Sequence, residues 1–87
     1  MKLMMIVVPD TGIETIVQEL VSCGFRVTRM ASTGGFLKKG NTTLMVGVES
    51  DKVEEVFSLL RRVSPAAEPN QHRATVFVVD MPAFEQI

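Results

Sequence analysis

Apolar residues follow two spacings along this chain of 87 residues, and the two spacings alternate in a regular order. Residues 3–8 form an uninterrupted apolar run that ends at Pro9, which predicts a strand with apolar side chains on both faces. In residues 13–21 and 53–63 the apolar positions recur every three or four residues, which predicts two helices that each bury one face. Gly24 stands where a glycine commonly ends a helix.

Polar residues before each predicted helix have the form of helix caps. Thr11 and Glu14 match a capping box, in which each side chain accepts a hydrogen bond from the backbone of the other residue. Ser50 or Asp51 can cap the second helix with a side-chain oxygen. We therefore expect both helices to begin at side-chain caps.

Three further strands are predicted from apolar and β-branched runs that are bounded by turn residues. They cover residues 25–32, 42–49 and 74–79. Pro65 ends the second helix, and residues 65–73 read as a loop before the last strand. The elements therefore follow the order βαββαβ.

This order predicts a ferredoxin-like α+β fold, in which a four-stranded antiparallel sheet carries both helices on one face. We expect residues 1–87 to form a single domain. The first and last strands are apolar on both faces, so the sheet face away from the helices should also be apolar. An apolar face of this kind usually marks an interface, which predicts an obligate homo-oligomer.

Composition narrows the functional classes. The formal net charge of −1 argues against a binder of nucleic-acid polymers, so any attraction for phosphate should be local. Cys23 and His72 are the only residues of their types, so neither an intrachain disulfide nor a Cys/His zinc site is expected. The first apolar run is too short for a membrane span or a typical signal peptide, and we expect a cytoplasmic protein with no membrane partner.

The residues that could bind a ligand gather around the predicted loop between the second and third strands. Arg26 and Thr28 project from one face of a strand, and Asn41 opens the returning strand. An arginine can engage a phosphate in two directions, while Asn and Thr can read the edge of a base or a sugar hydroxyl. An outward arginine on a solvated strand, with Thr28 present for its β propensity, would give the same pattern.

The loop itself begins with Gly34 and Gly35 and carries Phe36 and Leu37. Glycines let a backbone approach a ligand closely, and apolar residues beside them suggest a surface that a flat ligand or a neighbouring subunit covers. The sequence equally allows Phe36 and Leu37 to fold back onto the core, without any ligand or neighbouring subunit. Gly47 inside the third strand is explained either by a ligand or by a subunit contact.

The sequence favours a binding module over an enzyme such as a small hydrolase or isomerase. No two residues have the form of an acid–base or nucleophile–base couple, because the carboxylates stand mostly at helix starts or on outward faces. The glycine-rich loop is not a Walker loop, since the Gly-Lys-Ser/Thr ending is missing. It is not a dinucleotide fingerprint either, because it opens no helix.

Three segments around this loop carry a family likeness: Phe25-Arg-Val-Thr28, Thr33-Gly-Gly-Phe-Leu37 and Gly40-Asn-Thr-Thr43. On these residues, and on Gly47-Val-Glu49 and Ala74-Thr-Val-Phe-Val78, the chain resembles the PII-like cyclic-di-AMP receptor family. The resemblance implies a trimeric signal-transduction protein that binds cyclic di-AMP, or a related adenine nucleotide, in clefts between its subunits. It implies no further cofactor, and a downstream protein partner that the sequence does not name.

The resemblance also implies roles for single residues. Arg26 would approach a phosphate, and Thr28 and Asn41 would hydrogen-bond the base or ribose. Gly47 would leave room for the ligand. The remaining contacts would come from Val27 and from the backbone around Gly35, Phe36 and Leu37, which would flank an adenine.

One segment departs from the family pattern. Members carry a long loop before the last strand, rich in Gly, Pro and Val, where this chain has only residues 65–73. His72 and Arg73 also replace a Gly-Gly pair that usually precedes that strand. The shortened loop leaves an alternative function open, a structural or adaptor trimer that has lost nucleotide binding.

Overall fold

The computed structural model describes residues 1–30, 40–64, 74–83, 85 and 87. Its strands are β1 (Lys2–Pro9), β2 (Val27–Met30), β3 (Asn41–Val48) and β4 (Thr75–Asp80). Its helices are α1 (Ile13–Ser22) and α2 (Val53–Val63), and a short 3₁₀ turn precedes each of them, η1 (Asp10–Gly12) and η2 (Ser50–Lys52). This is the predicted βαββαβ order.

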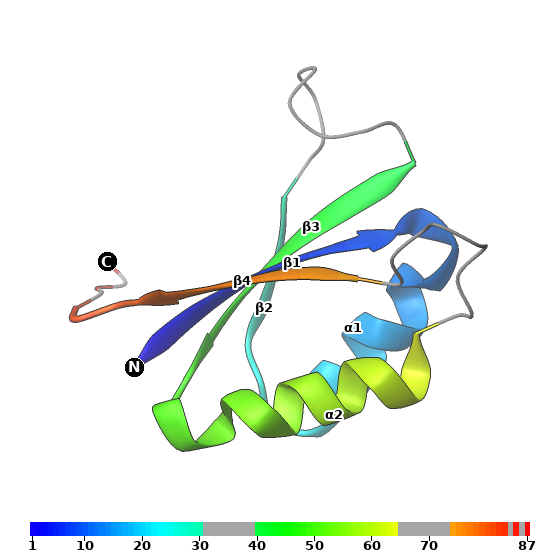
Figure 1. Ribbon diagram of the computed structural model, residues 1–87. Coiled ribbons are helices and arrows are strands. Elements are labelled where there is room, and N and C mark those ends of the chain that lie inside the picture. Colours follow the sequence, from blue (N-terminus) through cyan, green and yellow to red (C-terminus); the bar gives the residue numbers. More distant parts are fainter. Residues whose placement is uncertain (31–39, 65–73, 84, 86) are drawn as a thin grey trace.

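The four strands form one antiparallel sheet in the order β2-β3-β1-β4, and both helices lie on the same face of it (Figure 1). The predicted ferredoxin-like fold is therefore confirmed. β1 is central, so Leu3 lies between Gly47 of β3 and Val79 of β4. The start of β1 consequently lies beside the ends of β3 and β4, and this end of the sheet holds the cavity described below.

The hydrophobic core lies between the sheet and the helices. Alternate residues of β1 and β3 point toward the helices, because side chains alternate along a strand. They meet the apolar stripes of α1 and α2, neither of which is long and apolar enough to cross a membrane. The buried core residues are Met4, Ile6, Val8, Ile13, Ile16, Leu20, Leu44, Val46, Val48, Val56, Leu59 and Leu60.

The two helices begin differently from the prediction. Neither has a side-chain cap, so the capping box at Thr11 and Glu14 and the cap at Ser50 or Asp51 are wrong. A 3₁₀ turn carries the chain from each strand into the helix instead. Backbone hydrogen bonds of these turns satisfy amides that a side-chain cap would otherwise have served.

The end of α1 is as predicted. Gly24 has φ 89°, its N–H donates to the Val21 carbonyl at 3.0 Å, and the Phe25 N–H donates to the Leu20 carbonyl at 3.0 Å. These two bonds form a Schellman motif, in which a residue with a Cβ would be strained at the glycine position. The motif turns the chain out of the helix and so sets where Phe25 and Arg26 lead into β2.

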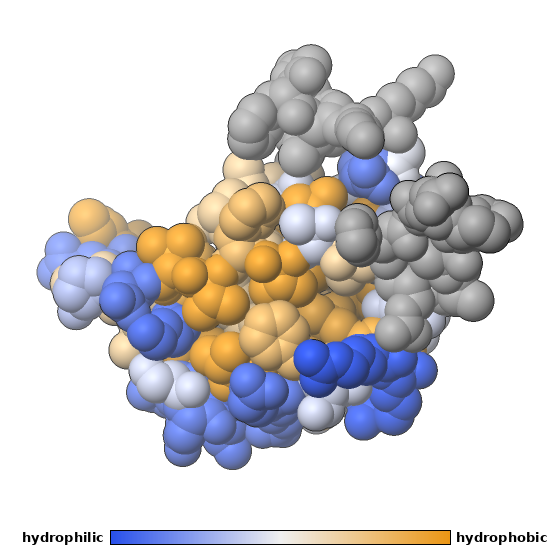
Figure 2. Space-filling view, in the orientation of Figure 1, coloured by the Kyte–Doolittle hydropathy of each residue, from blue (hydrophilic) through white to orange (hydrophobic). Residues whose placement is uncertain are grey.

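The sheet face away from the helices, here called the open face, is also largely apolar, as the sequence predicts. It carries the half-buried residues Leu3, Met5 and Val7 of β1, and Phe77 and Val79 of β4, which are 55% and 48% exposed. Figure 2, which looks onto the β4 edge of the sheet, shows apolar side chains gathered above the polar outer surface of α2. Much of the apolar surface on β4 therefore has no cover from the described part of this chain.

Candidate functional site

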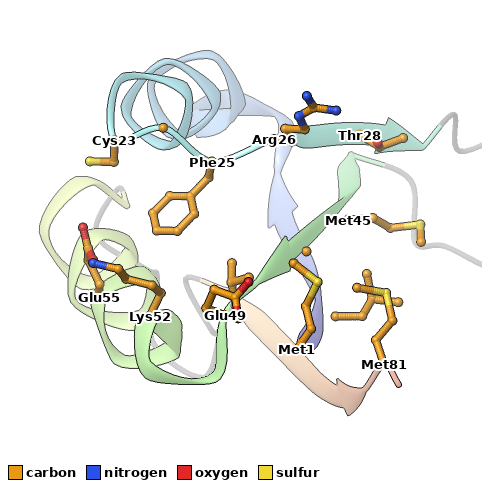
Figure 3. Close-up of a pocket in the computed structure, with 14 residues that line it drawn as sticks. Met1, Cys23, Phe25, Arg26, Thr28, Met45, Glu49, Lys52, Glu55 and Met81 are labelled. Atoms are coloured by element: carbon orange, nitrogen blue, oxygen red, sulfur yellow. The ribbon is translucent and has the colours of Figure 1, made fainter. Parts of the chain in front are cut away.

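A cavity of about 700 Å³ lies at the end of the sheet where β1 and β2 begin and β3 and β4 end (Figure 3). This volume is within the usual range for small-molecule sites. The cavity is lined by Met1, Leu3, Cys23, Gly24, Phe25, Arg26, Thr28, Met45, Gly47, Val48, Glu49, Lys52, Glu55 and Met81.

Arg26 and Thr28 reach the cavity from the start of β2. The strand pairing joins Val27 to Val46 and Thr28 to Met45, so Arg26 directly precedes the first paired residue, at the end of β3 where Gly47 lies. Side chains of directly paired residues lie on the same face of a sheet, so both polar groups lie on the open face. Gly47 lines the same cavity and, having no side chain, leaves the β3 backbone exposed to it.

Methionines form the apolar side of the cavity. Met1, Met45 and Met81 project into the same region in Figure 3. The methyl carbon of Met81 lies 3.4 Å from the point that a Cβ on Gly47 would occupy. Methionine side chains are unbranched and adaptable, so this surface can adjust to the shape of a flat ligand group.

The wall nearer the helices is aromatic and charged. The half-buried Phe25 ring projects between the end of α1 and the start of α2 (Figure 3). Lys52 and Glu55 form an ion pair of 3.5 Å one helical turn apart, and Glu49 lines the cavity as well. Both partners are about half exposed, so the pair contributes little stability, although it brings both signs of charge to this wall.

The arrangement suits an anion that carries a flat apolar group. The Arg26 guanidinium presents its N–H donors in a planar fork that matches the oxygen atoms of a phosphate. The Thr28 hydroxyl can donate or accept a hydrogen bond. In the part of the chain that the structure describes, no group of three or more His, Cys, Asp or Glu side chains is placed to hold a metal ion.

The structure brings three of the predicted site residues together and separates two others from them. Arg26, Thr28 and Gly47 line the same cavity. The Val27 side chain packs against the core on the helix side, so only its backbone could border a ligand on the open face. Asn41 begins β3 at the opposite end from Gly47, and six residues of strand at about 3.3 Å each separate the two by about 20 Å.

The remaining predicted contacts are Gly35, Phe36 and Leu37, which lie outside the described residues. Residues 65–73, where the chain departs from the family pattern, also lie outside them. The described part of the candidate site therefore lies where β1 and β2 begin and where β3 and β4 end.

Sequence reasoning did not single out Met1, Phe25 or Met81 as lining residues. Met1 and Met81 stand eighty positions apart, yet the Met81 N–H donates to the Met1 carbonyl at 3.0 Å. Only the pairing of the first strand with the last brings them together. The signal was present in the predicted βαββαβ order, in which these two strands run side by side.

Comparison with known sequences identifies the family. The sequence pattern described as "Cyclic-di-AMP receptor" matches residues 1–69, which is most of the chain. The chain belongs to the cyclic-di-AMP receptor family. The receptor match runs from β1 through α2 and includes Arg26, Thr28 and Gly47, but it ends before β4. The family is one of binding and signalling proteins rather than a class of enzymes.

A solved structure shares the receptor fold. It is the crystal structure of a functionally unknown protein from Pediococcus pentosaceus ATCC 25745, with 30% sequence identity and a TM-score of 0.77. The match covers 99% of this chain and 96% of that chain. The two proteins are therefore of similar length, and β4 has a counterpart in that structure although the receptor sequence match stops before it.

Proposed function

We propose that this member of the receptor family binds cyclic di-AMP, or a related adenine nucleotide, in clefts between the subunits of a homotrimer. The observation that carries the proposal is that Arg26, Thr28 and Gly47 line one cavity of small-molecule size. Family membership supplies the class of nucleotide. In this role the protein is a signalling module, and we expect it to act in the cytoplasm.

Each residue of the site would bind a different part of the nucleotide. Arg26 would pair with a phosphate through its guanidinium fork. Thr28, two residues along on the same face, would hydrogen-bond the ribose or the base. Gly47 would leave the β3 backbone open to close approach, and Met45 would pack against the base.

The position of Asn41 supports a site between subunits. Within one chain it lies about 20 Å from Gly47 and outside the lining of the cavity. If Asn41 contributes to the same site, a neighbouring subunit must present it. The apolar open face, where Phe77 is 55% exposed, offers a surface on which subunits can pack.

Signalling then follows from the arrangement of the subunits. A nucleotide that contacts two subunits at once stabilises the arrangement in which both sets of contacts are made. A ligand shifts a conformational equilibrium only by its difference in affinity for the two states. The downstream protein would recognise the arrangement that the occupied clefts favour.

Isothermal titration of the intact protein with cyclic di-AMP tests the proposal, with cyclic di-GMP and ATP as competing ligands. We expect cyclic di-AMP to bind, and Arg26→Ala to weaken its binding by about 1.5–3 kcal/mol, because a hydrogen-bonded charge on the phosphate is lost. Arg29→Ala is the matched control. It removes the same charge three residues further along the chain, but Arg29 points to the helix side and pairs with Glu14 at 3.0 Å.

Two results would contradict the proposal. Absence of binding by all three nucleotides at high protein concentration would favour a structural or adaptor trimer instead. Equal losses of affinity in Arg26→Ala and Arg29→Ala would show that net charge, and not the cavity, attracts the nucleotide.

A further inference from the structure

Met81 lies just beyond the end of β4, outside the part of the chain that the family sequence pattern matches. We infer that the Met81 side chain is a displaceable cover that lowers the affinity of the nucleotide site. This side chain covers Gly47, and a ligand that uses the open space at Gly47 must first displace it. This inference rests on the proposed function, because it concerns the same cavity.

Backbone contacts hold Met81 in place. Its N–H donates to the Met1 carbonyl at 3.0 Å, which extends the pairing of β1 and β4 by one step beyond Lys2 and Asp80. The Lys2 and Asp80 side chains form an ion pair at this last regular step. Pro82 follows and has no backbone N–H with which to continue the pairing. The hydrogen bond to Met1 therefore anchors the Met81 backbone to β1. The Met81 side chain can still change its rotamer, because it has three rotatable bonds.

The Met81 side chain crosses the start of β1 to reach β3. Leu3 of β1 stands between Val79 of β4 and Gly47 of β3, so β3 and β4 are about 10 Å apart. Residues at alternate positions share a face, so Met81 lies on the open face with Val79. Its terminal methyl ends 3.4 Å from the position of a Cβ on Gly47, which is van der Waals contact.

Met81 thus occupies space that the proposed function gives to the nucleotide. Arg26, Gly47 and Met81 line the same cavity, so a nucleotide whose phosphate is held by Arg26 and whose bulk lies at Gly47 meets the Met81 methyl. A ligand with bulk on this side must move that side chain. A methionine can swing aside through its own rotatable bonds without any change of backbone, so the cover is displaceable rather than permanent.

Calorimetric titration of Met81→Ala with cyclic di-AMP tests the inference on the intact protein. The variant should bind about four- to fifteenfold more tightly than the wild type, because the ligand no longer displaces an apolar contact worth about one to two buried methylene groups. Val21→Ala is the matched control, since it also shortens a partly exposed apolar side chain but lies on α1, away from the open face and outside the cavity lining. It should bind as the wild type does.

Each outcome decides between the two proposals. Wild-type binding with unchanged or weaker binding by Met81→Ala overturns the inference and leaves the proposed function standing. Binding by Met81→Ala alone supports the inference and shows that the cover is strong. If neither protein binds, the proposed function is wrong and the inference falls with it.

A second measurement does not depend on the affinity of a variant. Proteins labelled with ¹³C at the methionine methyl groups give one NMR signal per methionine, and Met81→Leu identifies the Met81 signal. This signal should shift on saturation with cyclic di-AMP as the methyl leaves Gly47. A Met81 signal that stays unchanged at saturation would overturn the inference.

Discussion

At the scale of single residues, the site depends on a side chain that is absent. Gly47 lines the same cavity as Arg26, and its missing Cβ leaves room that the Met81 methyl borders. A glycine inside a strand gives up packing and β propensity, which calls for a compensating role. Here the open space is shared between the Met81 methyl and, in our proposal, the nucleotide.

Gly47→Ala separates these two uses of the space. The added Cβ would meet the Met81 methyl at 3.4 Å, an ordinary contact, so the free energy of unfolding should change by less than about 0.5 kcal/mol. Nucleotide binding should weaken by about 1–3 kcal/mol, because a methyl group intrudes on a closely packed ligand. Thermal unfolding and calorimetric titration measure the two effects. Unchanged nucleotide affinity would contradict the role given to Gly47.

Residue chemistry in the sequence was enough to find Arg26 and Thr28, because alternation along a strand places them on one face beside the predicted loop. It was not enough to place Asn41. Sequence proximity across the loop suggested that Asn41 lies near them, whereas the register of β2 on β3 carries Arg26 to the opposite end of the strand. Register depends on pairing along the whole strand, which single residues do not reveal.

At the scale of elements, apolar periodicity predicted every strand and helix in the described part of the chain. The helix starts were mispredicted because a Thr or Ser before an apolar stripe has the same sequence form whether it caps the helix or enters a 3₁₀ turn. The contact between the Met1 and Met81 backbones was missed for another reason. It depends on the pairing of β1 with β4 across nearly the whole chain.

That pairing predicts a pH effect on stability. The hydrogen bond from Lys2, and then its positive charge, hold the pKa of the Asp80 carboxyl below its ordinary value of 3.8. A lowered pKa in the folded state stabilises the fold at pH values above 3.8, and this contribution is lost as the pH falls through the folded pKa. Lys2 and Asp80 are the last regular pair before Met81, so the effect belongs to the edge of the cavity.

Asp80→Asn tests this effect. The variant should unfold at a slightly lower temperature than the wild type at neutral pH, and the two melting curves should converge well below pH 3.8. The neutral amide keeps the size of the side chain but cannot respond to pH. A constant difference between the two proteins at every pH would show that the ion pair is not its source.

At the scale of the whole molecule, two features point beyond a single chain. The open face carries exposed apolar residues on β4, and Asn41 lies at the opposite end of β3 from the cavity. A closed ring of subunits would explain both features, because its head-to-tail contacts bury one surface of each subunit against a different surface of the next. Such contacts can cover the apolar residues on β4 and bring Asn41 of one subunit to the cavity of its neighbour. Each cleft would then take Arg26 from one subunit and Asn41 from the next.

Mixed subunits test this central claim most directly. Arg26→Ala and Asn41→Ala should each bind cyclic di-AMP weakly, and an equal mixture of the two is unfolded and refolded together before titration. In randomly mixed rings, about one cleft in four takes its Arg26 and its Asn41 from intact copies on neighbouring subunits. A refolded mixture of Arg26→Ala and Thr28→Ala is the control, because both changes lie on the same wall of the cleft.

The account predicts that the Arg26→Ala and Asn41→Ala mixture regains tight binding, at about a quarter of the wild-type number of sites, and that the control mixture regains none. If the first mixture also regains none, Arg26 and Asn41 do not meet across a boundary between subunits, and the proposed cleft is wrong.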